Sequence, residues 1–402
     1  MAESAFQKII RVRSVDLAVL DENAYYETIY ADSSLPNRRF YAIESPFRMD
    51  SQASAIFEKD SVTNKNKPKR KRKHHMSSNV TSDLHDVSVI LKKILRKAIA
   101  MDAFTKKQYE PVPCSSVEAS LNFNNCLARQ LARTAISVPC PLSRYVKQQC
   151  IIKQNIREIC LNEEKRSIDD ISNELIMWVN AESKVMTAEC KGEEFILPPF
   201  SSFIINDVCA SRALVRHGKR FDFILLDPPW ENKSVKRKNA YPTYEDQSWM
   251  SDLHIPELLT ESGVLAIWVT NNIRHLKFVD DMIEYFGFEK IATWRWLKVT
   301  NNGEPVYSLN SQHKQPFESI VFASSSASHY MNIVDEFVLI RHIFHTPSAI
   351  HSRKPPLLPV LQALGILKEL AVQLELYGRY LLPRTTTIGF EAAKLQNKRY
   401  FV

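Results

Sequence analysis

The second half of the chain alternates short apolar runs with stretches of helical periodicity. Apolar residues at helical spacing predict helices over 273–286 and 357–373. Strands separated by helices are typical of a mostly parallel sheet with helices on its faces. We therefore expect residues 198–402 to form an α/β domain. Its expected strands are the apolar runs at 200–208, 222–226, 263–269, 290–299, 318–323 and 374–377.

The first half contains apolar residues that recur every three or four positions. In the first of these stretches lysines and arginines fall on the opposite face, which predicts an amphipathic helix with a basic exterior. Such faces either bind nucleic acid or are the charged surface that any exposed helix presents. Because no catalytic cluster accompanies the helices, we expect a mainly helical accessory domain. It comprises residues 1–58 and 83–192, with helices over 84–98, 121–136, 144–161 and 168–179.

A basic segment lies between these two parts of the accessory domain. Within residues 59–82 the stretch Lys65–Lys73 contains Pro68 followed by five consecutive basic residues at 69–73. Like charges repel and resist burial, so this segment is expected to be a flexible linker. The string fits a nuclear import signal or contact with a polyanion, and a solvated linker is the alternative. The expected compartment is the nucleus, with the cytoplasm as the second choice.

The overall composition is that of a globular protein with an excess of positive charge. The 402 residues are 45% hydrophobic, and the formal net charge of +8 slightly favours a polyanionic partner such as nucleic acid. Seven cysteines without a Cys-x-x-Cys pair predict reduced thiols inside a cell and no bound metal. No apolar window approaches 18 residues, so neither secretion nor a membrane span is expected.

Glycine is scarce, with eight residues in the whole chain. The closest pair, Gly378 and Gly389, is eleven positions apart. Neither Gly-x-Gly-x-x-Gly nor the phosphate-binding Gly-x-x-x-x-Gly-Lys can therefore occur. This excludes a standard dinucleotide-binding enzyme and a P-loop nucleotide hydrolase, although the α/β pattern is compatible with either.

The apolar run at 221–226 stops abruptly at Asp227, Pro228, Pro229 and Trp230. Proline fixes φ and has no N–H to donate, so it ends the strand. The acid is thus expected at the carboxyl end of a central strand, where open α/β sheets bind ligands. A carboxylate and proline carbonyls accept hydrogen bonds, and an indole offers a flat stacking face. Together they fit a planar group that carries an NH₂.

The exocyclic amine of adenine is such a group, but it is a poor nucleophile because its lone pair is delocalised into the ring. If Asp227 and a proline carbonyl accept both amine hydrogens, the nitrogen becomes pyramidal and its lone pair is aimed at an electrophile. In-line attack on a methyl sulfonium is the expected reaction, and positioning supplies much of the rate. No strong general base is required, since the ammonium product loses its proton readily.

This stretch resembles the signature of the Asp-Pro-Pro-Trp adenine N6-methyltransferases, typified by the messenger-RNA adenosine methyltransferase. The continuation Glu231–Arg237 is similar to one branch, methyltransferase-like protein four. The fold that the resemblance implies is a Rossmann-like methyltransferase domain that uses S-adenosylmethionine. Six ordered matches make the resemblance specific. Beyond Asp227–Trp230 they are Trp268–Asn271, Trp294–Asn301, His313-Lys314 with Pro316 and Glu318, His351–Pro356 and Leu374–Arg379.

The resemblance also implies roles for individual residues. Asp227, Pro228, Pro229 and Trp230 would hold the target amine, with Asp227 close to the methyl donor. S-adenosylmethionine would be bound by Asp207 and Val208 at a strand end, by Asp227, by Lys314 at the cofactor carboxylate, by Arg379 near the ribose, and by Glu391. The target nucleotide would be lined by Asn232, Lys233, Lys236, Tyr244, Trp268, Trp296, His351 and Lys354.

Several of these residues have structural alternatives. Trp268 in an apolar strand fits the core as well as a stacking platform. Trp294 and Trp296 are expected to alternate across their strand, so that only one faces the site. The basic loop at 233–237 is either solvated or contacts phosphate, and His351 is either a ligand residue or a loop histidine.

The chain departs from the family's usual carboxyl-terminal pattern. Where the family has Asn-x-x-Pro-Gly-Trp and Gly-Asn-Glu, this chain has Tyr380–Thr385 and Gly389-Phe390-Glu391. Glu391 can still accept from ribose hydroxyls, whereas Leu382 and Phe390 cannot. The polar contact to the ribose is therefore expected to be partly replaced.

The resemblance implies methylation of the N6 amine of adenine in RNA, and the branch implies an internal 2′-O-methyladenosine of the U2 small nuclear RNA. Methylation of DNA adenine is the enzymatic alternative. A catalytically silent RNA-binding scaffold is the alternative from another class, although the intact Asp-Pro-Pro-Trp argues for activity. We expect the protein to act as a monomer, without a metal or a membrane.

Overall fold

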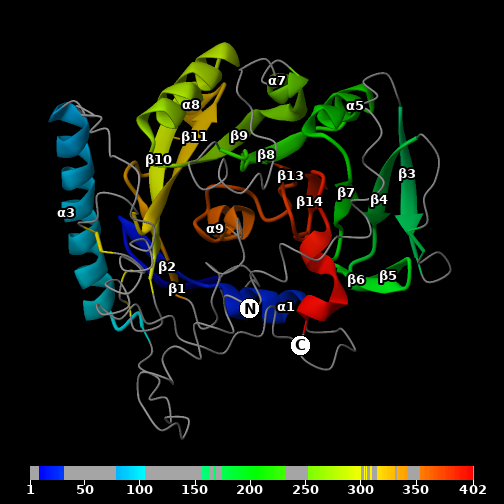
Figure 1. Cartoon of the computed structure of the whole chain (residues 1–402), viewed down its shortest axis with the longest axis horizontal. Helices are drawn as coiled ribbons and strands as arrows, with labels where there is room; N and C mark the ends of the chain where they lie inside the picture. The colour runs from blue at the N-terminus through cyan, green and yellow to red at the C-terminus, as the bar shows by residue number, and fades with distance from the viewer. Residues whose placement is uncertain are drawn as a thin grey trace, which may run out of the picture.

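The computed structural model describes most of the second half of the chain and selected parts of the first (Figure 1). None of the helices in this described part is both long and apolar enough to cross a membrane. The residues described are 9–30, 78–104, 155–162, 167–168, 174–230, 252–299, 303, 305, 308–309, 315–330, 333–342 and 354–401.

The described residues form fourteen strands, six α-helices and four 3₁₀ turns. The strands are β1 (Ile10–Arg13), β2 (Leu17–Asp21), β3 (Ile156–Leu161), β4 (Leu175–Asn180), β5 (Met186–Cys190), β6 (Glu193–Leu197), β7 (Ser202–Ile204), β8 (Phe221–Leu226), β9 (Leu259–Val269), β10 (Glu289–Lys298), β11 (Phe317–Ser324), β12 (Val338–His342), β13 (Gln373–Leu376) and β14 (Thr385–Ile388). The helices are α1 (Glu22–Ile29), α3 (Ser78–Ala100), α5 (Ser211–Arg216), α7 (Ile255–Leu258), α8 (Ile273–Tyr285) and α9 (Leu357–Ala363), with 3₁₀ turns at Val208–Ala210, Ala327–Tyr330, Lys394–Gln396 and Lys398–Tyr400.

Twelve of the described strands form one sheet, in the order β1-β2-β12-β10-β11-β9-β8-β13-β14-β7-β4-β3. Its centre is parallel, because β9, β8, β13, β14 and β7 are successive parallel neighbours. Strand β11 is antiparallel to both β9 and β10. The mostly parallel sheet predicted from the sequence is confirmed. Strands β5 and β6 pair separately as a hairpin.

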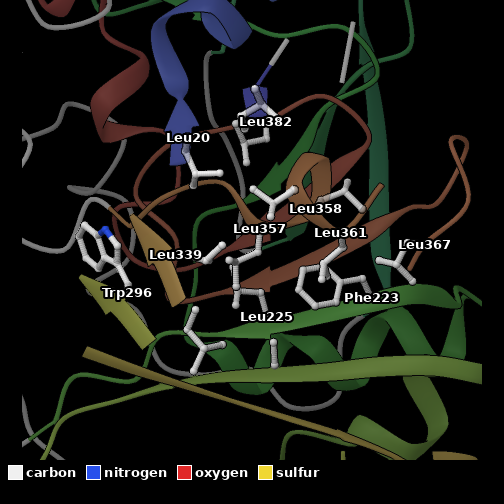
Figure 2. Packing of buried hydrophobic residues seen from close by; sticks show 14 of the residues in the cluster. Leu20, Phe223, Leu225, Trp296, Leu339, Leu357, Leu358, Leu361, Leu367 and Leu382 are labelled. Carbon is white, nitrogen blue, oxygen red and sulfur yellow. The ribbon is translucent and has the colours of Figure 1, made fainter. Parts of the chain in front are cut away.

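Apolar side chains cover both faces of the sheet. On one face Phe223 and Leu225 of β8 pack with Leu357, Leu358 and Leu361 of α9, as Figure 2 shows. On the other face Ile224 and Leu226 pack with residues of α5, α7 and α8. The side chains of β8 therefore alternate between two cores, which explains why its sequence is apolar at nearly every position. Strand β8, packed on both faces, therefore fixes the position of the residues that follow Leu226.

Segments from the first half of the chain extend this same sheet at its two ends. Strand β2 pairs in parallel with β12, and β4 pairs with β7. Helix α3 packs its apolar stripe on β2, β10 and β12, and confirms the helix predicted over 84–98. The mainly helical accessory domain is not confirmed. The flexible linker predicted for 59–82 and the helix predicted for 121–136 lie outside the described residues, except that α3 already begins at Ser78.

Three helix predictions differ from the structure. The described parts of 144–161 and 168–179 form strands β3 and β4 instead. In β3 the buried residues Ile156 and Ile159 happen to be three apart, which imitates helical spacing, and pairing with β4 decides the conformation. The helix predicted over 357–373 ends at Ala363, because Gly365 takes a left-handed φ of +75° and Ile366 N–H closes the turn on the Leu361 carbonyl at 2.8 Å.

The strand directions bring several chain ends to one edge of the sheet. The carboxyl ends of β7, β14, β13, β8 and β9 meet there because these strands are parallel. The amino end of antiparallel β11 reaches the same edge, since Ser319 pairs with Val269. The carboxyl end of β10 joins them, since Trp296 pairs with Glu318. This edge collects those polar residues singled out in the sequence that the structure describes: Asp207, Asp227, Lys354, Arg379 and Glu391.

Candidate active site

Asp227 stands directly beyond the end of β8, at the centre of this edge. Its backbone N–H still donates to the Leu376 carbonyl of β13 at 3.4 Å, which fixes the acid against the neighbouring strand. The two prolines then end the strand. The Trp230 N–H donates to the Pro228 carbonyl at 2.8 Å and folds the following turn. The position of the acid predicted from the sequence is therefore the one observed.

Asp227 and three other charged side chains form a partly buried chain of ion pairs. The Lys354 Nζ donates to Asp227 Oδ1 at 3.1 Å and lies 2.8 Å from Glu318 Oε2. Lys298 pairs with the other oxygen of Glu318. The side chains of Asp227 and Lys354 are each only 13% exposed. Two cations thus compensate two carboxylates in a place where an uncompensated charge would be costly.

The pKa values of these groups follow from that arrangement. Burial raises the pKa of the Asp227 carboxyl above its ordinary value, although Lys354 opposes the shift. Burial would raise the pKa of Glu318 too, but the charges of Lys354 and Lys298 hold it well below its usual range. The pKa of Lys354 is raised despite burial because Asp227 and Glu318 favour its charged form. Lys354 is therefore the cation that the two carboxylates share.

Two tryptophans lie beneath the ammonium groups. The Lys354 Nζ is 5.2 Å from the ring centroid of Trp268, and the Lys298 Nζ is 4.6 Å from that of Trp296. The two rings meet edge to face, with centroids 5.6 Å apart. Both are buried, with 1% and 3% exposure. The aromatic faces stabilise the cations from below, and neither ring offers an open face for a base.

The side chains of Trp294 and Trp296 do not alternate across β10, contrary to the expectation from the sequence. Residues two apart on a strand point to the same face, so both rings lie in the same core. Trp294 packs on Phe322 and Phe337, farther from the strand end, whereas Trp296 reaches Trp268. Distance along the strand, not the face, separates their roles.

The ends of β7, β13 and β14 carry a second polar group. Asp207 accepts from the Cys209 N–H at 3.0 Å, and Val208 beside it is buried in the core. Glu391 pairs with Arg379 at 3.3 Å and with Lys394 at 2.6 Å. These acids and cations stand at the same edge as Asp227, on neighbouring strands.

Gly378 allows the ends of β13 and β14 to approach closely. A Cβ at Gly378 would lie 2.5 Å from the Thr387 Cγ2 atom.

The charged residues at this edge can bind a ligand of mixed charge. Cations can bind a carboxylate of the ligand, and acids can bind its hydroxyl or ammonium groups. This donor and acceptor set fits S-adenosylmethionine, which carries all of these groups, and which would supply an electrophilic methyl.

Glu375 is a buried acid that the sequence analysis did not single out. It lies on β13, opposite Leu225, and Gln373 Nε2 donates to its Oε2 at 3.4 Å. Burial raises the pKa of Glu375 from 4.5 to about 8, and the charge of Asp227 contributes. The folded protein therefore binds a proton at Glu375 that the unfolded chain has already released at neutral pH.

The free energy of unfolding is accordingly expected to fall as pH rises from about 5 to about 8, by up to about 1.4 kcal/mol per pH unit from this group. The sign follows because the folded state binds more protons in this window. In Glu375→Gln this contribution disappears and the slope becomes smaller. The measurement is urea unfolding of the wild type and Glu375→Gln at several pH values. An equal dependence of the unfolding free energy on pH in the two proteins would contradict the assigned pKa.

Comparison with known proteins agrees with this geometry. The MT-A70 family matches residues 221–391, which include Asp227 and the neighbouring strand ends. The DNA N6-methyl methyltransferase of Caenorhabditis elegans is 33% identical over 396 residues, 96% of this chain and 98% of that protein. The chain belongs to the MT-A70 family. The resemblance noted in the sequence is confirmed.

Other MT-A70 relatives match a shorter region. The human N(6)-adenine-specific methyltransferase METTL4 is 34% identical over 249 residues, 60% of this chain and 52% of that protein. The N6-methyladenosine RNA methyltransferase MTA1 of Pyricularia oryzae is 29% identical over 257 residues, 61% of this chain and 65% of that protein. The Caenorhabditis elegans protein is thus named for DNA and the Pyricularia oryzae protein for RNA, whereas the name of human METTL4 specifies adenine alone.

The structure of this MT-A70 protein describes part of the predicted site. It brings Asp227 and Lys354 into contact, with Trp268 below Lys354 and Trp296 against Trp268. It also places Asp207, Arg379 and Glu391 at the same sheet edge. Glu318 and Lys298 were missed as site residues. The sequence feature that could have indicated them is that each is a charged residue at the end of an apolar strand. Both lie on the same face of the sheet as Trp296. Predicted site residues outside the described part are Asn232, Lys233, Lys236, Tyr244, Lys314 and His351.

Proposed function

We propose that this MT-A70 protein transfers a methyl group from S-adenosylmethionine to the N6 amine of adenine in RNA. The observation that carries the proposal is the position of Asp227, at the carboxyl end of β8 and beside Lys354. Lys354 engages Oδ1, and no described side chain donates to Oδ2. That oxygen is available to accept one amine hydrogen.

The Pro228 carbonyl is the proposed acceptor of the second amine hydrogen. It already accepts the Trp230 N–H, but a carbonyl oxygen has two lone pairs. Because both acceptors are fixed before the substrate binds, little reorganisation is needed as charge develops on the nitrogen. Lys354 orients the Asp227 carboxylate, and Glu318 holds Lys354 in place. Asp207, Arg379 and Glu391 are proposed to bind the cofactor.

The target nucleotide is proposed more specifically. The branch resemblance favours an adenosine that already carries a 2′-O-methyl group, as in the U2 small nuclear RNA. The second candidate is DNA adenine, favoured by the Caenorhabditis elegans relative, which matches over nearly its whole length. We propose RNA first, with the protein acting as a monomer.

A methylation assay on matched oligonucleotides distinguishes these substrates. The same sequence is offered with one adenosine, one 2′-O-methyladenosine or one deoxyadenosine, and labelled S-adenosylmethionine is the donor. The fastest transfer is expected on 2′-O-methyladenosine. Preference for deoxyadenosine would replace RNA by DNA as the substrate. Absence of transfer to all three, with cofactor binding intact, would favour the silent scaffold.

The basic segment Lys65–Lys73 is proposed to direct the protein to the nucleus. Five consecutive basic residues at 69–73 carry this proposal. Replacing all five with alanine is expected to move a fluorescent fusion from the nucleus to the cytoplasm. Methylation of a short oligonucleotide by the purified variant serves as the control and should be unchanged. An unaltered nuclear signal would overturn the assignment.

A further inference from the structure

Trp230 is held by contacts on more than one side. Its indole N–H donates to the Trp268 carbonyl at 2.7 Å. One face of the ring stacks on the imidazole of His275, with centroids 4.9 Å apart and an angle of 23° between the planes. Phe278, one helical turn further along α8, meets the indole edge to face at 5.9 Å. The ring is therefore oriented by helix α8 as well as by its own turn.

His275 is itself fixed. Its Nδ1 lies 2.5 Å from the Thr270 hydroxyl, at the end of β9. The helix that carries it is capped by Asn272, whose side chain accepts from the Arg274 N–H at 3.0 Å. The His275 imidazole thus connects the end of β9 to the ring of Trp230. A stacked aromatic pair of this kind limits rotation of the indole.

We propose that His275 is a positioning residue for substrate binding: it backs one face of Trp230 so that the opposite face stacks on the target adenine. The inference rests on the proposed function, because it assigns the target base to the indole three positions after Asp227 in the chain. Trp268 and Trp296 are buried, whereas Trp230 is only partly buried. Trp230 is thus the accessible indole at this edge among the described residues.

The two faces of the Trp230 indole would then have different roles: one packs on His275 and the other binds the adenine. A base gains most from stacking when the aromatic surface is already oriented, since less conformational freedom is then lost on binding. His275 supplies that orientation without touching the reacting atoms. Loss of the imidazole should weaken the binding of the oligonucleotide while leaving the cofactor-binding residues in place.

The test compares His275→Ala, His275→Phe and the control His329→Ala, a histidine on an exposed 3₁₀ turn. His275→Ala is expected to raise KM for the oligonucleotide about tenfold, with a smaller change in kcat. His275→Phe keeps a flat ring and should recover most of the loss. Affinity for S-adenosylmethionine, measured by calorimetry, should be unchanged in all three. A KM for His275→Ala like that of the control, or no recovery in His275→Phe, would overturn the proposal.

A second readout separates this inference from the proposed function. Stacking of adenine on Trp230 should quench part of the tryptophan fluorescence when oligonucleotide is added without cofactor. The quench should be lost in Trp230→Leu and strongly reduced in His275→Ala. If the wild-type protein transfers no methyl group, the proposed function fails. An equal quench in wild type and His275→Ala would still overturn the positioning role.

Discussion

Asp227→Asn is expected to lower kcat/KM for methyl transfer by about 100-fold or more. Asparagine has nearly the same shape, but it carries no charge and presents an NH₂ where the carboxylate accepts hydrogen bonds. An amine hydrogen of the substrate would then face a donor. The measurement is transfer of labelled methyl from S-adenosylmethionine to an adenosine oligonucleotide at saturating cofactor.

The fold should survive this change, because burial already disfavours the charged form of Asp227. Circular dichroism and the thermal midpoint verify that point. Asp281→Asn, the same chemical change on the exposed side of α8, is the matched control and should retain full activity. Near-normal transfer by Asp227→Asn would overturn the assignment of the acceptor.

Lys354→Met is expected to have the largest effect on stability, a loss of about 3–5 kcal/mol in the free energy of unfolding. Methionine fills similar space but leaves Asp227 without its cation and Glu318 with Lys298 alone. A buried carboxylate that loses its partner either bears the cost of desolvation or takes up a proton. Either outcome also abolishes methyl transfer. Urea unfolding at pH 7 provides the measurement.

Two comparisons make this result specific. Lys398→Met removes a lysine from an exposed pair with Glu194, whose side chains are 46% and 47% exposed, and should change stability by about 0–1 kcal/mol. The double variant Lys354→Met with Asp227→Asn removes one buried cation and one buried anion together. It should be more stable than Lys354→Met alone, although inactive. If the loss of unfolding free energy in the double variant equalled the sum of the losses in the two single variants, the coupling between these residues would be contradicted.

The part of the fold that the sequence predicts well lies where local pattern and tertiary environment agree. The run from Phe221 to Leu226 is apolar because both of its faces are buried, and proline ends it in any context. Helix α8 has a clear amphipathic pattern and an Asn272 cap. Strands β3 and β4 could not be recognised in the same way. Their conformation depends on pairing with each other and with β7, residues distant in the sequence.

The candidate site shows the same limit. Asp227 was assigned from its immediate neighbours, because strand end, prolines and indole are all local features. The contact between Lys354 and Asp227 joins residues 127 positions apart, and no periodicity reports it. Glu318 reaches the edge only because β11 runs antiparallel to its neighbours. Such juxtapositions follow from topology, which the sequence pattern leaves open.

The pairing of β2 with β12 has a consequence for the order of folding. Leu17 lies opposite Val338, so β2 cannot find this partner until the chain as far as β12 has left the ribosome. Contacts between such distant segments slow folding, and the apolar strand β2 stays exposed in the meantime. Its residues Leu17 to Leu20 are fully buried in the finished protein. Among the described strands, β2 is thus one that a nascent chain must protect from aggregation until β12 has been made.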